Sequence, residues 1–233
     1  IAYSTDGITW TGLGSIIFSQ GRGVSWNGVR WVAVGDGGAC YSSDGITWTL
    51  ASNSIITIGN AVEFNLERQH RITFPVNSML AVGQGTNTIA YSNSNGATWL
   101  GIGTSIFSTA GRGAAWNGIR WVAVGEGTNT IAYSNDGVTW TGLGNSIFSN
   151  SGLGVCWNGV RWIAVGNGTN TIAISNDGIT CTGLGSIVFN SGGNMVASNP
   201  RVGPTIVDSQ IVLNSNGYGQ SNVLDIVTSS YYN

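Results

Sequence analysis

One eight-residue phrase, Tyr-Ser-x-Asp-Gly-x-Thr-Trp, recurs along the chain and constrains its fold more than any other feature. It occurs at 3–10, 41–48 and 133–140, with variants at 91–99 and 174–181. The turn residue falls at Asp6, Asp44, Asn95, Asp136 and Asp177, with spacings of 38, 51, 41 and 41 residues. Self-similarity at a period of about 40 residues is the signature of a repeat architecture.

A second phrase, Trp-Asn-Gly-x-Arg-Trp-(Val/Ile)-Ala-Val-Gly, starts at Trp26, Trp116 and Trp157. Asn-Gly between alternating apolar residues predicts a two-residue hairpin, and the Asp-Gly of the first phrase predicts another turn. Each unit therefore predicts four short strands, A to D, with Asn-Gly between A and B and Asp-Gly between C and D. Strand D is expected over the stretch Thr-Trp-Thr-Gly-Leu-Gly. No helical periodicity occurs. Four-stranded units repeated radially indicate an all-β protein of the β-propeller class.

We expect one propeller domain over 1–233 with about six repeat units, five to seven being possible. Residues 1–14 supply strands C and D of an incomplete unit, and 184–233 form a divergent unit whose strand A is expected at Met195–Pro200. The full units are 15–50, 51–101, 102–142 and 143–183. If 184–233 is a whole blade, the chain is a fragment of a larger ring. If it supplies A and B alone, these could pair with 1–14 and close a five-bladed ring.

The phrase Ser-x-Asp-Gly-x-Thr-Trp resembles the Asp-box of the BNR, or sialidase-type, β-propellers. It is one residue shorter than the common form, which has a residue between Asp and Gly. The sequence at 127–140 is also similar to propeller-repeat proteins of large DNA viruses and some bacteria. It reads Gly-Thr-Asn-Thr-Ile-Ala-Tyr-Ser-Asn-Asp-Gly-Val-Thr-Trp. The resemblance implies the propeller fold and spans 3–181, but Asp-box propellers serve many unrelated functions.

The composition excludes several functional classes. Charged residues make up 8% of the chain, all eight basic residues are Arg, and the net charge is -2. A nucleic-acid binder needs a basic patch and a peripheral anchor needs a polybasic segment, so we expect neither partner. The chain contains no run of about 18 apolar residues, so we expect no membrane insertion. One histidine and three cysteines without CxxC spacing predict no metal site and no cofactor.

The repeated polar residues are expected to be structural. An acid before glycine caps its own turn, and Asn95 is expected to do the same without charge. Arg30, Arg120 and Arg161 are expected to pair with turn acids or carbonyl groups. Sialidase chemistry, as the resemblance implies it, needs an Arg cluster, a Tyr nucleophile with a Glu partner, and an Asp acid/base. No such set stands outside the repeat, so we expect no catalytic residues and no enzyme activity.

Two departures from the repeat are candidate binding sites. Residues 66–77 replace the Asn-Gly turn of the second full unit and form a candidate partner loop with Glu67, Arg68, His70 and Arg71. The loop between strands B and C keeps its glycine frame while one position varies. We call the four residues there the rim residues: Asp36, Gln84, Glu126 and Asn167. Asn87, Asn129 and Asn170 follow in the same loops and complete the candidate ligand-binding set. Surface drift or a tolerated insertion would give the same patterns.

These observations predict a non-catalytic recognition module that binds carbohydrate or protein at an extracellular or virion surface. The alternative is a self-assembling structural subunit of a filament, tail or capsid, because scarcity of charge also marks the cores of protein interfaces. A degenerate sialidase-like glycoside hydrolase is a second alternative. The expected partners are a glycan, a protein surface or further copies of the chain.

Overall fold

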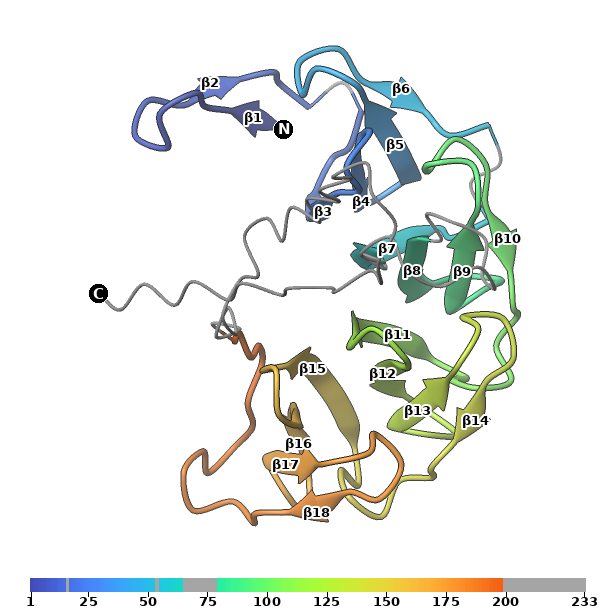
Figure 1. Cartoon of the computed structure of the whole chain (residues 1–233), viewed down its shortest axis with the longest axis vertical. Helices are drawn as coiled ribbons and strands as arrows, with labels where there is room; N and C mark the ends of the chain where they lie inside the picture. Colours follow the sequence, from blue (N-terminus) through green and yellow to red (C-terminus); the bar gives the residue numbers. More distant parts are fainter. Residues whose placement is uncertain (16, 53–54, 65–78, 199–233) are drawn as a thin grey trace, which may run out of the picture. The chain divides into compact units, whose positions relative to one another are not determined.

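The computed structural model describes residues 1–15, 17–52, 55–64 and 79–198 (Figure 1). Every strand in this part of the chain belongs to one compact unit, Ile1–Asn199. The strands are short and pair antiparallel, and no helix occurs among the described residues. The expected all-β class is therefore confirmed.

Sixteen of the described strands form four groups, which we call the first to fourth blades, each with four strands paired in the order A-B-C-D. The third and fourth blades are joined into one sheet by a single residue pair, Glu126 with Ser151. The first blade is β3 (Gly21–Trp26), β4 (Trp31–Gly35), β5 (Gly38–Ser42) and β6 (Thr49–Leu50). The second is β7 (Ile58–Phe64), β8 (Met79–Gln84), β9 (Ile89–Ser92) and β10 (Leu100–Gly101). The third is β11 (Ala110–Trp116), β12 (Trp121–Glu126), β13 (Ile131–Ser134) and β14 (Thr141–Gly142). The fourth is β15 (Ser151–Trp157), β16 (Trp162–Asn167), β17 (Ile172–Ser175) and β18 (Thr182–Gly183).

Two further strands, β1 (Ala2–Tyr3) and β2 (Thr11–Gly12), pair with each other and correspond to strands C and D of a unit. Ile1 beside this half-sheet packs onto the cluster of Phe18, Ala33 and Cys40 in the first blade and its entry loop. The half-sheet thus lies before the first blade, as the repeat order requires.

The Asn-Gly turns close the A–B hairpins through the asparagine side chain. Asn27 Oδ1 accepts hydrogen bonds from the backbone N–H groups of Val29 at 2.9 Å and Arg30 at 2.7 Å. Gly28 adopts a φ of 89°, a left-handed conformation that glycine tolerates without strain. Asn117 and Asn158 make the same pair of bonds in the third and fourth blades.

Strand D is shorter than the sequence pattern predicts. The stretch Thr-Trp-Thr-Gly-Leu-Gly indicated a six-residue strand, but β14 pairs with β13 over Thr141 and Gly142 alone. The preceding residues bond to the turn instead: Thr139 N–H donates to Asp136 Oδ1, and Trp140 Nε1 donates to Gly137 O at 3.0 Å. A short outer strand also leaves little edge for pairing with another chain.

Successive blades meet where strand A of one crosses strand B of the blade before it. A β-carbon at Gly59 would lie 2.5 Å from Val34 Cβ, and one at Gly111 would lie 2.7 Å from Val82 Cβ. Real side chains do not approach this closely, so glycine at this position sets the separation of the blades. The same contact recurs between Gly152 and Val124.

Tryptophan pairs lie at the A–B end of the first, third and fourth blades. The rings of Trp116 and Trp121 have centroids 5.1 Å apart, within the range of favourable aromatic contacts. Trp121 is 1% exposed because it packs with Leu80 and Phe107 in the cluster between the second and third blades. Trp31 holds the same position in the first blade and is 39% exposed.

Residues beyond the fourth blade continue its packing pattern. A β-carbon at Gly193 would lie 2.8 Å from Val165 Cβ, and Met195 Cα lies 3.2 Å from the β-carbon position of Gly154. Ser198 Oγ donates to Trp157 O at 2.8 Å. The segment therefore occupies the place of a next strand A, although no strand pairing forms there. Residues 199–233, which include most of the divergent unit 184–233, lie outside the described residues.

The interface tryptophans give a paired test of blade packing. Trp121→Ala should lower the free energy of unfolding by about 3–5 kcal/mol, because it empties a fully buried aromatic site. Trp31→Ala should cost about 1–2 kcal/mol, because much of its ring is already in water. Urea unfolding followed by circular dichroism measures both. Equal losses would contradict the assignment of Trp121 to an interface that Trp31 lacks.

Candidate functional site

Each strand A contains a β-bulge, and in the first and third blades the bulge points an arginine at the rim residue of the same blade. In the first and third blades the pairing shifts register between Gly21 and Gly23 and between Gly111 and Gly113. Bulges commonly re-aim a side chain. Here they direct Arg22 Nε to Asp36 Oδ1 at 3.0 Å and Arg112 Nη2 to Glu126 Oε2 at 2.8 Å. The two acidic rim residues are therefore ion-paired.

In the second and fourth blades both the bulge residue and the rim residue are neutral. In the second blade the bulge residue is Asn60 and the rim residue is Gln84, and in the fourth blade they are Leu153 and Asn167. Asn60 Nδ2 donates to Gly111 O at 2.8 Å, which links the second blade to the third. Asn167 Oδ1 accepts from the N–H and Oγ of Ser151. The bulge and rim residues thus vary together along the repeat, and we call these four pairs the paired row.

The asparagines that follow the rim residues hold the loops together. Asn129 Nδ2 donates to Ile106 O at 2.7 Å, while its Oδ1 accepts from Gly144 N–H at 2.8 Å. Asn87 and Asn170 make the corresponding pairs of bonds. The amide nitrogen and the amide oxygen of each side chain are both hydrogen-bonded to backbone groups of the protein. These three members of the candidate ligand-binding set therefore have a structural role.

The turn acids lie at the opposite end of the strands and cap their turns. Asp44 Oδ1 accepts from the N–H groups of Thr47 at 2.7 Å and Ile46 at 2.8 Å, and Ser42 Oγ also donates to it at 2.9 Å. These donors hold the pKa of Asp44 at about 2, well below its ordinary value. The same arrangement lowers the pKa of Asp6 and of Asp177 to about 2. For Asp136, burial opposes ionisation, but the hydrogen bonds outweigh it and lower the pKa.

The turn of the second blade corrects one expectation. Ser94, not Asn95, takes the place of the acid: its Oγ accepts from Thr98 N–H at 2.8 Å. Asn95 is an additional residue with a φ of 54°, a left-handed conformation that asparagine tolerates better than most residues. Its Oδ1 accepts from Asn27 Nδ2 at 3.2 Å. Because the extra residue lies between Ser94 and Gly96, the residue directly before the glycine is not the capping residue in this turn.

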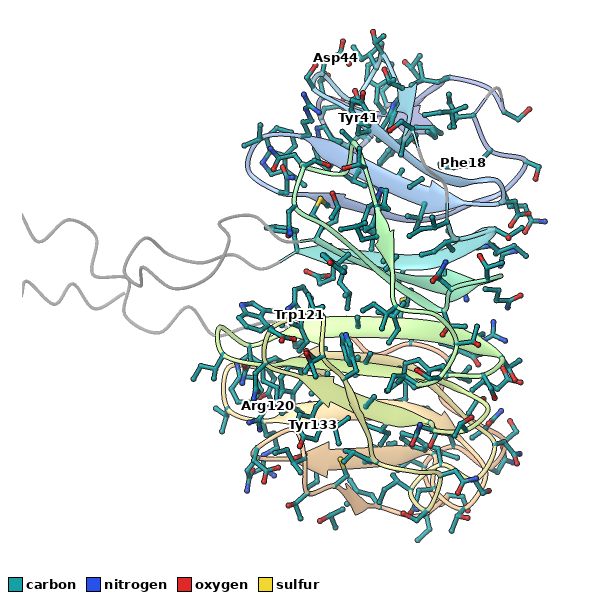
Figure 2. All side chains as sticks on the ribbon, turned by 90° about the vertical axis from the view of Figure 1, so that its right-hand side faces the viewer. Phe18, Tyr41, Asp44, Arg120, Trp121 and Tyr133 are labelled. Atoms are coloured by element: carbon teal, nitrogen blue, oxygen red, sulfur yellow. The ribbon has the colours of Figure 1, made fainter. Side chains whose placement is uncertain are left out.

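The arginines after the Asn-Gly turns pack on the tyrosines of strand C. The guanidinium carbon of Arg120 lies 5.2 Å from the centre of the Tyr133 ring (Figure 2). Arg120 also donates to Asn135 Oδ1 at 2.9 Å and to the backbone oxygen of Asp177 in the next blade. Arg30 lies 4.9 Å from the Tyr41 ring centre. In the fourth blade the tyrosine position holds Ile174. The expected contact with a carbonyl group is therefore present at Arg120.

The remaining titratable groups are buried between strands. Burial raises the pKa of the Cys40 thiol to about 12 and also raises the pKa of the Cys156 and Cys181 thiols. Burial raises the pKa of Glu63 in β7 to about 6. Within the described ranges, no three His, Cys, Asp or Glu side chains come together in a way that could hold a metal ion. Glu67, Arg68, His70 and Arg71 of the candidate partner loop lie outside those ranges.

The described part of the chain has no helix that is long and apolar enough to span a bilayer. A cavity of about 30 Å³ lies between the second and third blades, where it is lined by Tyr91, Trp121 and Asp136 among others. A space of this size holds a water molecule and no larger ligand. The paired row, whose ion-paired side chains are partly exposed, is the candidate ligand-binding surface.

Comparison with known proteins identifies the fold. No family model matches the chain, and no curated protein matches its sequence. Among solved structures, an ancestral GH74 enzyme aligns with 74% of this chain and 25% of its own length, at a TM-score of 0.54 and 14% identity. The GH74 enzyme of Niastella koreensis aligns with 70% of this chain and 29% of its own, at 0.52 and 20%. YCF48 from Cyanidioschyzon merolae aligns with 71% and 56%, at 0.50 and 14%.

These neighbours and the curled antiparallel sheets identify a β-propeller fold. The chain spans about a quarter of each GH74 enzyme and little more than half of YCF48. At identities of 20% or below, the likeness concerns the arrangement of strands and carries no residue of a site from those proteins to this one.

The capped turns predict a loss of stability in acid. The folded-state pKa of Asp44 and Asp177 lies near 2 and the ordinary value is 3.8, so their stabilisation is complete above about pH 4 and is lost as the pH falls through 2. Asp44→Asn and Asp177→Asn should each flatten the dependence of unfolding free energy on pH between 4 and 2, by about one proton per turn. Chemical unfolding at a series of pH values measures this.

The second blade supplies the reciprocal control. Ser94→Asp places an acid in the one described turn of a full blade that has none, so it should steepen the same dependence by a similar amount. If the slope is unchanged in all three variants, the turn hydrogen bonds do not couple to protonation.

Proposed function

We propose that this protein is a non-catalytic β-propeller recognition module that binds a carbohydrate or a protein at an extracellular or virion surface. The observation that carries the proposal is the paired row. Four consecutive blades present a bulge residue and a rim residue in one constant frame, and the pairs change from Arg–Asp to Asn–Gln to Arg–Glu to Leu–Asn. Variable side chains on loops held by a rigid scaffold are the usual basis of recognition.

The chemistry of the paired row suits hydrogen bonding to hydroxyl and amide groups. Carboxylate, guanidinium and carboxamide groups together supply both donors and acceptors. The side chains of Arg112 and Glu126 are 30% and 36% exposed, so they hold each other in place and still face water. A side chain positioned in this way loses little conformational entropy when a ligand binds.

The surroundings of the described acids favour binding over catalysis. Glycoside hydrolysis requires two carboxyl groups that flank one bond. The turn acids are used in caps, Asp36 and Glu126 are ion-paired, and Glu63 lies in β7. A degenerate glycoside hydrolase is therefore the weaker proposal, although two of the fold's neighbours are GH74 enzymes.

We also propose that the turns belong to the Asp-box class. The cap of Asp44 through Ser42, Ile46 and Thr47 supports this assignment. The 92–99 turn, with one residue between Ser94 and Gly96, has the length of the common Asp-box form.

A second candidate function is self-assembly, favoured by the tips of the A–B turns. The residue after each Asn-Gly is an exposed aliphatic side chain: Val29 at 52%, Ile119 at 74% and Val160 at 69%. These tips lie at the end of the strands opposite the paired row, since strands A and B are antiparallel. Repeated apolar tips on one face would suit contacts between copies in a filament, tail or capsid.

A glycan array and a sedimentation analysis of the purified chain test the proposal together. The variant Arg112→Leu with Glu126→Asn gives the third blade the natural pair of the fourth, so stability should change by no more than about 1 kcal/mol. Binding to any glycan or protein identified should weaken by about tenfold or more, since the ion pair is lost. Asn167→Ala should weaken it as well.

The matched control is Ile119→Ser, which alters an exposed tip at the other end of the same blade and should leave binding unchanged. Full binding by the Arg112→Leu, Glu126→Asn variant would contradict a site at the paired row. Defined oligomers without any glycan signal, dispersed by Ile119→Ser, would instead establish the assembly function.

A further inference from the structure

One side of the first blade is apolar and exposed, whereas the corresponding side of the third blade is covered. Val24 of β3 is 60% exposed, Trp26 is 38% exposed and Trp31 of β4 is 39% exposed. We call these three residues the open face. In the third blade the corresponding residues are Ala114, Trp116 and Trp121, which pack against Leu80 and Val82 of the second blade. The open face is thus the side on which the strand B of a preceding blade would lie.

The half-sheet beside the open face has an unused edge of its own. In the full blades strand C pairs on both sides, as β5 does with β4 and β6. Among the described strands, β1 pairs with β2 and with no other. Trp10 of this half-sheet is 63% exposed, whereas Trp99 in the same position of the second blade is 2% exposed. Both features leave room for an A–B hairpin between β1 and the open face.

We propose that the open face and the edge of β1 together bind an A–B β-hairpin of this same repeat sequence. The contact that it would make is already present four times in succession. Val34 lies on Gly59, Val82 on Gly111, Val124 on Gly152 and Val165 on Gly193. The next contact in the series, read backwards, places a strand B valine on Gly21.

The space for that valine is present. The β-carbon position of Gly21 has a single heavy atom within 4 Å, Phe18 Cδ2 at 3.9 Å. At Gly59, Gly111, Gly152 and Gly193 the equivalent space holds a valine β-carbon at 2.5–2.8 Å. A hairpin with the pattern Arg-Trp-Val-Ala-Val-Gly in its second strand carries the valines at the required spacing.

The edge of β1 supplies the second element of recognition. Addition of a strand to an exposed sheet edge gains affinity from main-chain hydrogen bonds and specificity from alternate side chains. In the first blade the register of strand B on strand C is Val32 opposite Tyr41 and Ala33 opposite Cys40. The same register on β1 places a valine opposite Tyr3 and an alanine opposite Ala2.

A peptide with the sequence of the third blade's A–B hairpin serves as the probe for this binding site. A synthetic peptide of residues 109–127 contains the complete β11–β12 hairpin, with Val122 and Val124 on the side that faces the following blade. Labelled at its end, it should bind the purified full chain with saturable one-to-one stoichiometry in a fluorescence anisotropy titration. A control peptide with Val122→Asp and Val124→Asp should not bind, because each carboxylate would be buried without a partner.

Two exposed valines of the first blade form the matched pair on the protein. Val24→Asp lies on the open face and should weaken peptide binding by about tenfold or more. Val29→Asp lies at the A–B turn, outside the open face, and should leave it unchanged. Both side chains are more than half exposed, so neither substitution should unfold the chain. Absence of peptide binding, or equal binding by both variants, would overturn the proposal.

A thiol placed on the open face distinguishes an available site from one that the chain itself covers. The Val24→Cys thiol should react rapidly with a thiol reagent and be protected by the peptide. Cys40 and Cys156 are buried and Cys181 is partly buried, so the reaction rate of the unsubstituted chain is measured and subtracted as the background. Slow reaction without peptide would overturn the proposal.

Discussion

The contact between a strand B valine and a strand A glycine is the constraint on which the rest of this structure depends. At Gly59 a β-carbon would come within 2.5 Å of Val34 Cβ, so even alanine would force the blades apart. A second glycine in each unit has a related role: at Gly125 a β-carbon would lie 2.6 Å from the Phe107 ring and 2.4 Å from Ala110 O. The high glycine content is therefore a packing requirement of the propeller, and it fixes the frame within which other positions vary.

The features that the sequence predicted correctly are those encoded by adjacent residues. Asn-Gly and Asp-Gly specify their turns through hydrogen bonds within three residues, as at Asn27 and Asp44, and the alternation between the turns specifies the strands. The β-propeller class followed from repetition of these local signals. The prediction was wrong at Asn95, where one additional residue left the phrase recognisable but moved the capping role to Ser94.

The paired row could not be derived in the same way, because it depends on a β-bulge. Arg22 and Asp36 are fourteen residues apart, and the register shift between Gly21 and Gly23 directs one at the other. The variation of the rim residues is visible in the sequence, but the bulge residue that varies with each of them lies at least fourteen residues away. An alignment of the repeats shows the correspondence: an Arg at the bulge occurs with an acid at the rim, and a neutral bulge residue occurs with a neutral rim residue. The internal bonds of Asn129 were hidden for a similar reason, since both partners lie in other loops of the unit.

Each blade of a repeat protein contacts its immediate neighbours, so energetic effects stay local. A change at Arg112 and Glu126 alters one exposed pair and leaves the buried contact of Gly111 with Val82 untouched, which allows recognition to diverge without loss of the fold. The same locality explains the open face. Trp121 and Trp31 have the same sequence context, yet one is buried and the other is not, because burial is conferred by the neighbouring blade and not by the unit itself. A hairpin that completes the first blade's interface therefore needs to match that single neighbour, and the repeat sequence already specifies the match.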